Sequence, residues 1–135
     1  MPFPLDESQL SVTESKLGVK FPVSFRQRMM ESNGGELETG DEAWELYPFH
    51  DTSDKKRMTR TFNDIIKETD SAKGWDSFPK GAIAIGSNGC GDQLVLLPDT
   101  NNPQVLQSAV YFWNHETGDV VKLANDFAEL GSELG

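Results

Sequence analysis

The sequence is poor in cysteine and in long apolar runs, and each shortage excludes a class of protein. Its single cysteine, Cys90, cannot form an internal disulfide, which is typical of a protein from a reducing compartment. No apolar stretch approaches the roughly 20 residues of a membrane-spanning helix. The opening MPFPLDES lacks the basic start and the apolar stretch of a signal peptide. We therefore expect a soluble, cytoplasmic protein.

Basic residues are also scarce. Lys and Arg number 12 against 22 Asp and Glu, which gives a formal net charge of −10. Such a field repels phosphate backbones and anionic lipid heads, so we expect no nucleic acid and no membrane as partners. It favours a basic partner. Acidity also serves solubility, however, so net charge alone does not establish that a partner exists.

The size and the composition fit one globular domain. The chain has 135 residues, of which 36% are hydrophobic and 25% charged. A chain of this length buries roughly two-thirds of its unfolded surface, which is enough for a core without disulfides. It has no internal repeats, no low-complexity tract and no long linker. Residues 1–135 are therefore predicted to form a single domain.

Four stretches carry helix signals, at residues 6–18, 22–32, 54–70 and 125–134. In the first, Asp6 is the expected N-cap, Gln9 completes a capping box, and Gly18 ends the helix. The third has apolar residues at helical spacing, but basic residues in its first turn oppose the helix dipole. Its start is therefore expected near residue 59 or 61. In the last, Asn125 is the expected cap and Leu134 extends the apolar face.

Five stretches are predicted strands, at residues 44–49, 82–85, 92–97, 109–113 and 120–123. A polar, acidic stretch at residues 36–45 leads into the first of them. An Asn88–Gly89 pair predicts a tight turn between the second and third strands, and residues 114–119 close a hairpin between the last two. The predicted fold class is therefore α+β, with one antiparallel meander sheet and helices packed against it.

The glycine-rich loop at residues 86–91 lacks the spacing of phosphate-binding motifs, and a strand follows it, so we expect a hairpin loop. Two catalytic alternatives remain open. Cys90, His115 and Asp92 could act as nucleophile, base and orienting group, and Asp92, His115 and Glu116 could hold a divalent metal. Because no activating motif surrounds Cys90, and because neighbouring strand residues diverge, we expect no catalytic residue, no metal and no cofactor.

Aromatic residues beside the predicted sheet offer a protein-binding surface instead. They are Trp44, Tyr47, Trp75, Tyr111 and Trp113. Most such rings belong to the core. A ring exposed beside the loops of Asp92 and His115, however, would be an interface anchor. The partner-binding residues predicted on this basis are Trp44, Asp92, Trp113, His115 and Glu116.

Four stretches in the same order resemble the SUKH superfamily, which includes bacterial immunity proteins and yeast cell-wall-synthesis regulators. Residues 17–25, followed by Asn33-Gly34-Gly35, are similar to the family's opening pair of helices. Residues 83–92 are similar to its apolar strand that leads into Gly-Asp. Residues 110–116 are similar to its aromatic strand near a His, and residues 123–130 to its closing helix.

This resemblance implies an α+β fold and no known catalysis. For bacterial members it implies neutralisation of a toxin by direct binding, and many such toxins are basic nucleases. The acidic balance of this chain is compatible with such a partner. A regulatory interaction protein of the same fold with a different partner is the alternative, and a small hydrolase or metal enzyme is a third hypothesis. The sequence does not predict the oligomeric state.

Overall fold

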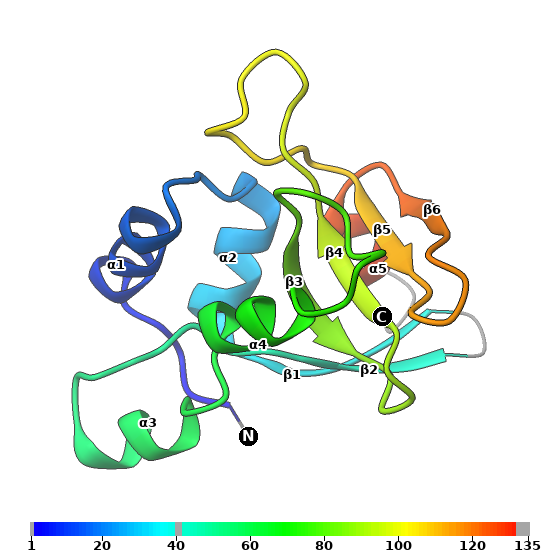
Figure 1. Ribbon diagram of the computed structural model, residues 1–135. Helices are drawn as coiled ribbons and strands as arrows, with labels where there is room; N and C mark the ends of the chain where they lie inside the picture. Colours follow the sequence, from blue (N-terminus) through cyan, green and yellow to red (C-terminus); the bar gives the residue numbers. More distant parts are fainter. Residues whose placement is uncertain (1, 40–41, 132–135) are drawn as a thin grey trace.

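A computed structural model describes residues 2–39 and 42–131, which contain one antiparallel sheet of six strands (Figure 1). The strands lie side by side in chain order, as a meander, and this arrangement confirms the predicted α+β fold class. Their bounds are β1 (Gly35–Thr39), β2 (Glu42–Leu46), β3 (Ile83–Ser87), β4 (Gln93–Leu96), β5 (Val110–Trp113) and β6 (Val120–Ala124).

Five helices accompany the sheet in the described residues, and α1, α2 and α4 lie beside it in Figure 1, with α3 standing apart. Their bounds are α1 (Glu7–Leu17), α2 (Val23–Glu31), α3 (Lys55–Arg60), α4 (Ile65–Ala72) and α5 (Phe127–Gly131). None of these helices is long and apolar enough to cross a bilayer, counting described residues only.

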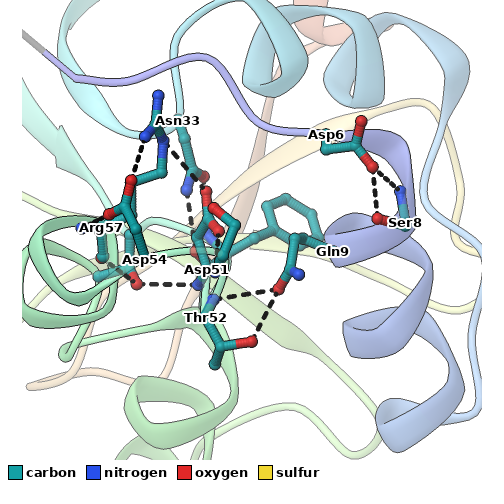
Figure 2. Close-up of polar contacts among 11 residues, drawn as sticks. Asp6, Ser8, Gln9, Asn33, Asp51, Thr52, Asp54 and Arg57 are labelled. Atoms are coloured by element: carbon teal, nitrogen blue, oxygen red, sulfur yellow. Dashed lines mark hydrogen bonds and ion pairs between the residues drawn. The ribbon is translucent and has the colours of Figure 1, made fainter.

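The ends of α1 follow the predicted signals with one exception. The carboxylate of Asp6 accepts a hydrogen bond from the Ser8 backbone at 3.0 Å, and Gly18 ends the helix with a φ of 73°. The expected capping box is wrong. Oε1 of Gln9 instead accepts a hydrogen bond from the Thr52 backbone at 3.1 Å (Figure 2). Gln9 therefore ties α1 to the loop that precedes α3.

The Asn33-Gly34-Gly35 motif ends α2 and fixes the chain that follows. Its Asn33 amide donates to the Phe49 carbonyl at 2.9 Å and accepts from the Phe49 backbone N–H at 2.8 Å. Both groups are buried, so the side chain replaces a strand neighbour that Phe49 lacks. Gly34 and Gly35 have φ values of 109° and 92°, which L side chains rarely adopt.

The hairpin of β1 and β2 was not expected. The acidic run, in which no strand was predicted before residue 44, contributes to both strands, and Leu37 and Trp44 lie opposite each other in the pair. Both side chains are buried. The strand predicted from residue 44 accordingly starts earlier, at Glu42, and ends at Leu46.

The helix predicted over residues 54–70 is two helices. Asp54 caps α3 by accepting from the Arg57 backbone at 2.7 Å, and Asp64 caps α4 by accepting from the Lys67 backbone at 3.0 Å. The expected start near residue 59 or 61 was therefore wrong. The helix starts at Lys55 despite its basic first turn, because Asp54 both caps it and pairs with the Arg57 side chain.

The sheet is curled and is buried on both faces at its centre. Leu94, Val95 and Leu96 of β4 are all fully buried. The rings of Trp44 in β2 and Phe112 in β5 are 5.5 Å apart, although two strands separate them in the sheet. Helix α5 contacts both end strands, β1 and β6. The curl therefore brings residues from distant strands into one core.

The last helix begins one residue later than expected. Oδ2 of Asp126, and not Asn125, accepts from the first turn, at the Ala128 backbone 3.2 Å away. Phe127 and Leu130 are buried as predicted, and Leu134 lies outside the described residues.

Candidate partner-binding site

The loop between β3 and β4 is a tight hairpin that presents Asp92 at its end. The Asn88 side chain donates to Oδ2 of Asp92 at 3.1 Å, and Gly89 has a φ of 83°. The Asn88 amide also reaches Oε2 of Glu42, in β2, at 3.4 Å. This arrangement confirms the predicted turn and links the loop to an acidic residue of the first hairpin.

Asp92 joins this loop to the turn between β5 and β6. Its Oδ1 lies 2.7 Å from Nδ1 of His115 and accepts from the His115 backbone N–H at 3.1 Å. Partial burial alone would raise the pKa of Asp92. The hydrogen bonds from His115 and Asn88 outweigh that effect and hold the pKa below its ordinary value of 3.8. Asp92 is therefore a carboxylate at neutral pH.

Gly91 allows the histidine to lie against the loop. A Cβ at position 91 would meet Cε1 of His115 at 2.9 Å, and the backbone there has a φ of 102°. Only glycine satisfies both conditions. The Gly-Asp pair therefore fixes the position of His115 twice, once by space and once by hydrogen bonds.

An exposed tryptophan packs against the same histidine. Trp75 is 51% exposed, and its ring lies edge-on to those of His115 and Trp113, at 5.4 and 6.3 Å between centroids. The segment that carries it is fixed from below, because Nε1 of Trp113 donates to the Ser77 carbonyl at 3.1 Å and Phe78 packs on Trp113 at 5.0 Å. Trp75 is therefore a partly exposed ring on a rigid support.

The structure brings together only part of the predicted partner-binding set. Asp92 and His115 are in contact, and Glu116 is exposed in the same turn. Trp44 and Trp113 are each only 1% exposed, so neither ring is the anchor that the sequence suggested. The curl of the sheet packs Phe112 on Trp44, and the segment between α4 and β3 covers Trp113 with Trp75 and Phe78.

Trp75 was missing from the predicted set. It lies between α4 and β3, where no periodic pattern marks its environment. One signal was present: its immediate neighbours, from Lys73 to Ser77, are all glycine, charged or polar. A large ring in such a segment is a candidate for a surface anchor.

The geometry offers little support for the catalytic alternatives. Cys90 is exposed, and its backbone N–H donates to the Asn88 side chain at 2.9 Å. Nδ1 of His115 is bonded to Asp92, and no hydrogen bond connects the thiol to His115 among the residues that the structure describes. Within residues 2–39 and 42–131, no three His, Cys, Asp or Glu side chains are arranged to hold a metal.

Comparison with known proteins identifies the fold family. The sequence matches the SMI1 / KNR4 family (SUKH-1) over residues 4–132, nearly the whole chain. No curated protein matches it. The match covers the helix pair with its Asn-Gly-Gly stop, the Gly-Asp loop, the aromatic strand and the closing helix on which the resemblance rested. This chain belongs to the SMI1/KNR4 (SUKH-1) family.

Proposed function

We propose that this chain is a non-catalytic immunity protein, which binds and neutralises a basic toxin domain. The observation that carries the proposal is the exposed ring of Trp75, held rigidly against His115 beside the Asp92 carboxylate. An aromatic anchor on a preorganised support is the feature that most often dominates protein interfaces. Membership of the SUKH-1 family supports a protein partner in general terms.

Charge supplies the second part of the proposal. The net charge of −10 steers a basic domain toward this protein and repels other acidic surfaces. A nuclease toxin would be basic because it must bind phosphates. An acidic protein that covers the cationic surface of the toxin would exclude nucleic acid from that surface. Neutralisation then requires binding alone, with no chemistry by the immunity protein.

In this proposal, Trp75 and the residues around it have different roles. The ring buries apolar area against the partner and sets the dissociation rate. Glu116 is exposed in the neighbouring turn and contributes to charge steering. Asp92 and His115 hold each other and support the ring from below, so they act mainly by positioning.

Co-expression tests the proposal. The parent chain is expected to rescue cells that produce the basic toxin domain encoded next to its gene, and to co-purify with that domain. It should not rescue cells from an unrelated toxin. If rescue fails and no basic neighbouring domain binds, the immunity role is wrong, and a regulatory interaction protein of the same fold is the remaining reading.

A further inference from the structure

Helix α3 is a cationic element in an acidic protein. Its six residues include Lys55, Lys56, Arg57 and Arg60 and no acidic residue. They are four of the 12 basic residues in the chain. The rest of the chain therefore has eight basic residues and all 22 acidic ones. Charge of one sign is therefore concentrated on a single short helix, about 9 Å long at 1.5 Å per residue.

The helix contributes nothing to the core. None of its residues is buried, and it stands apart from the sheet in Figure 1. Met58 on the helix is 42% exposed, and Phe62 just after it is 63% exposed. These two apolar side chains add an exposed hydrophobic area to the cationic one, a combination that marks an interaction surface.

A polar network nevertheless holds α3 in place (Figure 2). Nε of Arg57 lies 3.8 Å from Oδ2 of Asp51, which is only 2% exposed. The Asp51 backbone N–H donates to Oγ1 of Thr61 at 2.9 Å, and that hydroxyl donates to the Arg57 carbonyl at 2.9 Å. Arg57 thus anchors the helix. Lys55 and Lys56 are exposed, and the helix that carries them is held in place.

Cationic side chains of this region also lie over two phenylalanine rings. Arg57, Arg60 and Lys56 lie over the Phe3 ring, at 4.3, 5.0 and 5.9 Å from its centroid. Nζ of Lys67 lies 3.7 Å from the centroid of Phe62. These cation–π contacts, together with the ion pairs of Arg57 with Asp54 and of Lys67 with Asp64, offset part of the repulsion between these like charges. An anion bound between them would offset more of it, because opposite charges at short range attract.

We propose that this α3 surface, made of Lys55, Lys56, Arg60, Met58, Phe62 and Lys67, binds a short acidic segment of a partner protein. The cations would contact its carboxylates, and Met58 and Phe62 an apolar side chain within it. A nucleic acid fits less well, because the net charge of −10 repels a chain of phosphates that extends past this small patch. The surface shares no residue with the Trp75 region, and the inference does not depend on the immunity role.

Fluorescence anisotropy with a labelled synthetic peptide tests this inference. The probe alternates Glu and Asp around a central Leu-Phe pair. The parent protein is expected to bind it, and Lys55→Glu/Lys56→Glu is expected to weaken binding at least about tenfold. The matched control, Lys73→Glu/Lys80→Glu, makes the same change in net charge at two exposed lysines outside α3. It should weaken binding less than about twofold.

The apolar part has its own variant. Met58→Ser/Phe62→Ser should weaken binding about fivefold or more and leave the salt dependence unchanged, because it removes apolar area and no charge. Far-UV circular dichroism checks that each variant is folded. The inference is overturned if the parent does not bind the peptide, if both charge variants lose affinity equally, or if an oligonucleotide of equal charge binds as well. It is also overturned if sedimentation shows that the parent is a dimer and that Lys55→Glu/Lys56→Glu makes it a monomer.

Discussion

At the scale of single residues, the hairpin glycines do two different things. Gly89 and Gly91 both have positive φ, at 83° and 102°. A Cβ at Gly89 would meet nothing within 4 Å, whereas one at Gly91 would collide with the His115 ring. The first glycine is needed for its backbone conformation alone. The second is needed for its conformation and for the space that the histidine occupies.

This difference predicts unequal costs of substitution. Gly89→Val should lower the free energy of unfolding by about 1–2 kcal/mol, the cost of a left-handed conformation for a residue with a Cβ. Gly91→Val should cost distinctly more, since it adds a clash with His115. Urea unfolding of both variants measures the two values. Equal losses would mean that His115 does not lie against the loop.

Asp92 predicts a pH dependence with a definite sign. Its pKa in the folded protein lies below the ordinary 3.8, so its stabilising effect is complete above that pH and is lost as the pH falls through the folded value. At neutral pH, Asp92→Asn should be less stable than the parent by about 1 kcal/mol or more, since it weakens hydrogen bonds to a charged acceptor.

Urea unfolding of parent and variant between neutral and strongly acidic pH measures this difference, and the comparison cancels the other carboxylates. The gap should narrow below pH 3.8. A gap that is constant across this range would show that Asp92 is not ionised against His115 and Asn88.

At the scale of elements, α4 packs Ile65 and Ala72 into the core and also bonds the sheet through a buried hydroxyl. Oγ1 of Thr69 accepts a hydrogen bond from the Ala84 backbone at 2.9 Å, and Thr69 has no exposed surface. This bond falls next to the bulge in β3, where the register shifts between Ala84 and Gly86. The side chain therefore satisfies a backbone donor in the buried part of β3.

Thr69→Val keeps the shape of the side chain and removes this acceptor. It should lower the free energy of unfolding by about 1–3 kcal/mol, the cost of an unsatisfied buried N–H. Thr59→Val is the control, since Thr59 is exposed on α3 and its hydroxyl bonds the Lys55 carbonyl at 3.0 Å. It should change stability by less than about 0.5 kcal/mol. If the two variants melt alike in a thermal scan, the Thr69 bond does not hold α4 to β3.

Elements with strong local signals could be predicted, and those that depend on distant contacts could not. The strands from Ile83 onward follow from their apolar composition and from the Asn88–Gly89 turn. The hairpin of β1 and β2 could not be predicted, because β1 has one large apolar residue, Leu37, and its partner Trp44 lies on the other strand. The spacing of apolar residues likewise predicted one helix where the structure has α3 and α4. That spacing carries no information on the cap of Asp64, which begins a new helix.

The same contrast holds for the candidate site. Asp92 and His115 were selected from the sequence, and the structure joins them. Trp113 is buried, and the sequence did not show this because alternation along β5 indicates only that a residue faces one side of the sheet. It does not show that Phe78 and Trp75 cover that side. Which ring stays exposed is decided by the loop packed over the sheet, and a single sequence does not encode that packing locally.

At the scale of the whole molecule, the protein has two candidate binding surfaces of different charge. The Trp75 region lies near Asp92 and Glu116, and α3 holds a third of all basic residues. Long-range steering by the net charge of −10 is screened beyond about 8 Å at physiological salt. Salt should therefore slow the association of a basic partner and leave its dissociation nearly unchanged.

The kinetics of binding to the basic domain encoded next to the gene test the role of Trp75 most directly. Surface plasmon resonance compares the parent, Trp75→Ala and Val23→Ala, a control that trims an apolar side chain 68% exposed on α2. Trp75→Ala should speed dissociation at least about tenfold, as expected for an anchor residue. Its melting temperature should stay close to that of the parent, and Val23→Ala should dissociate like the parent. A Trp75→Ala protein that is folded and dissociates at the parent rate would contradict the proposed site.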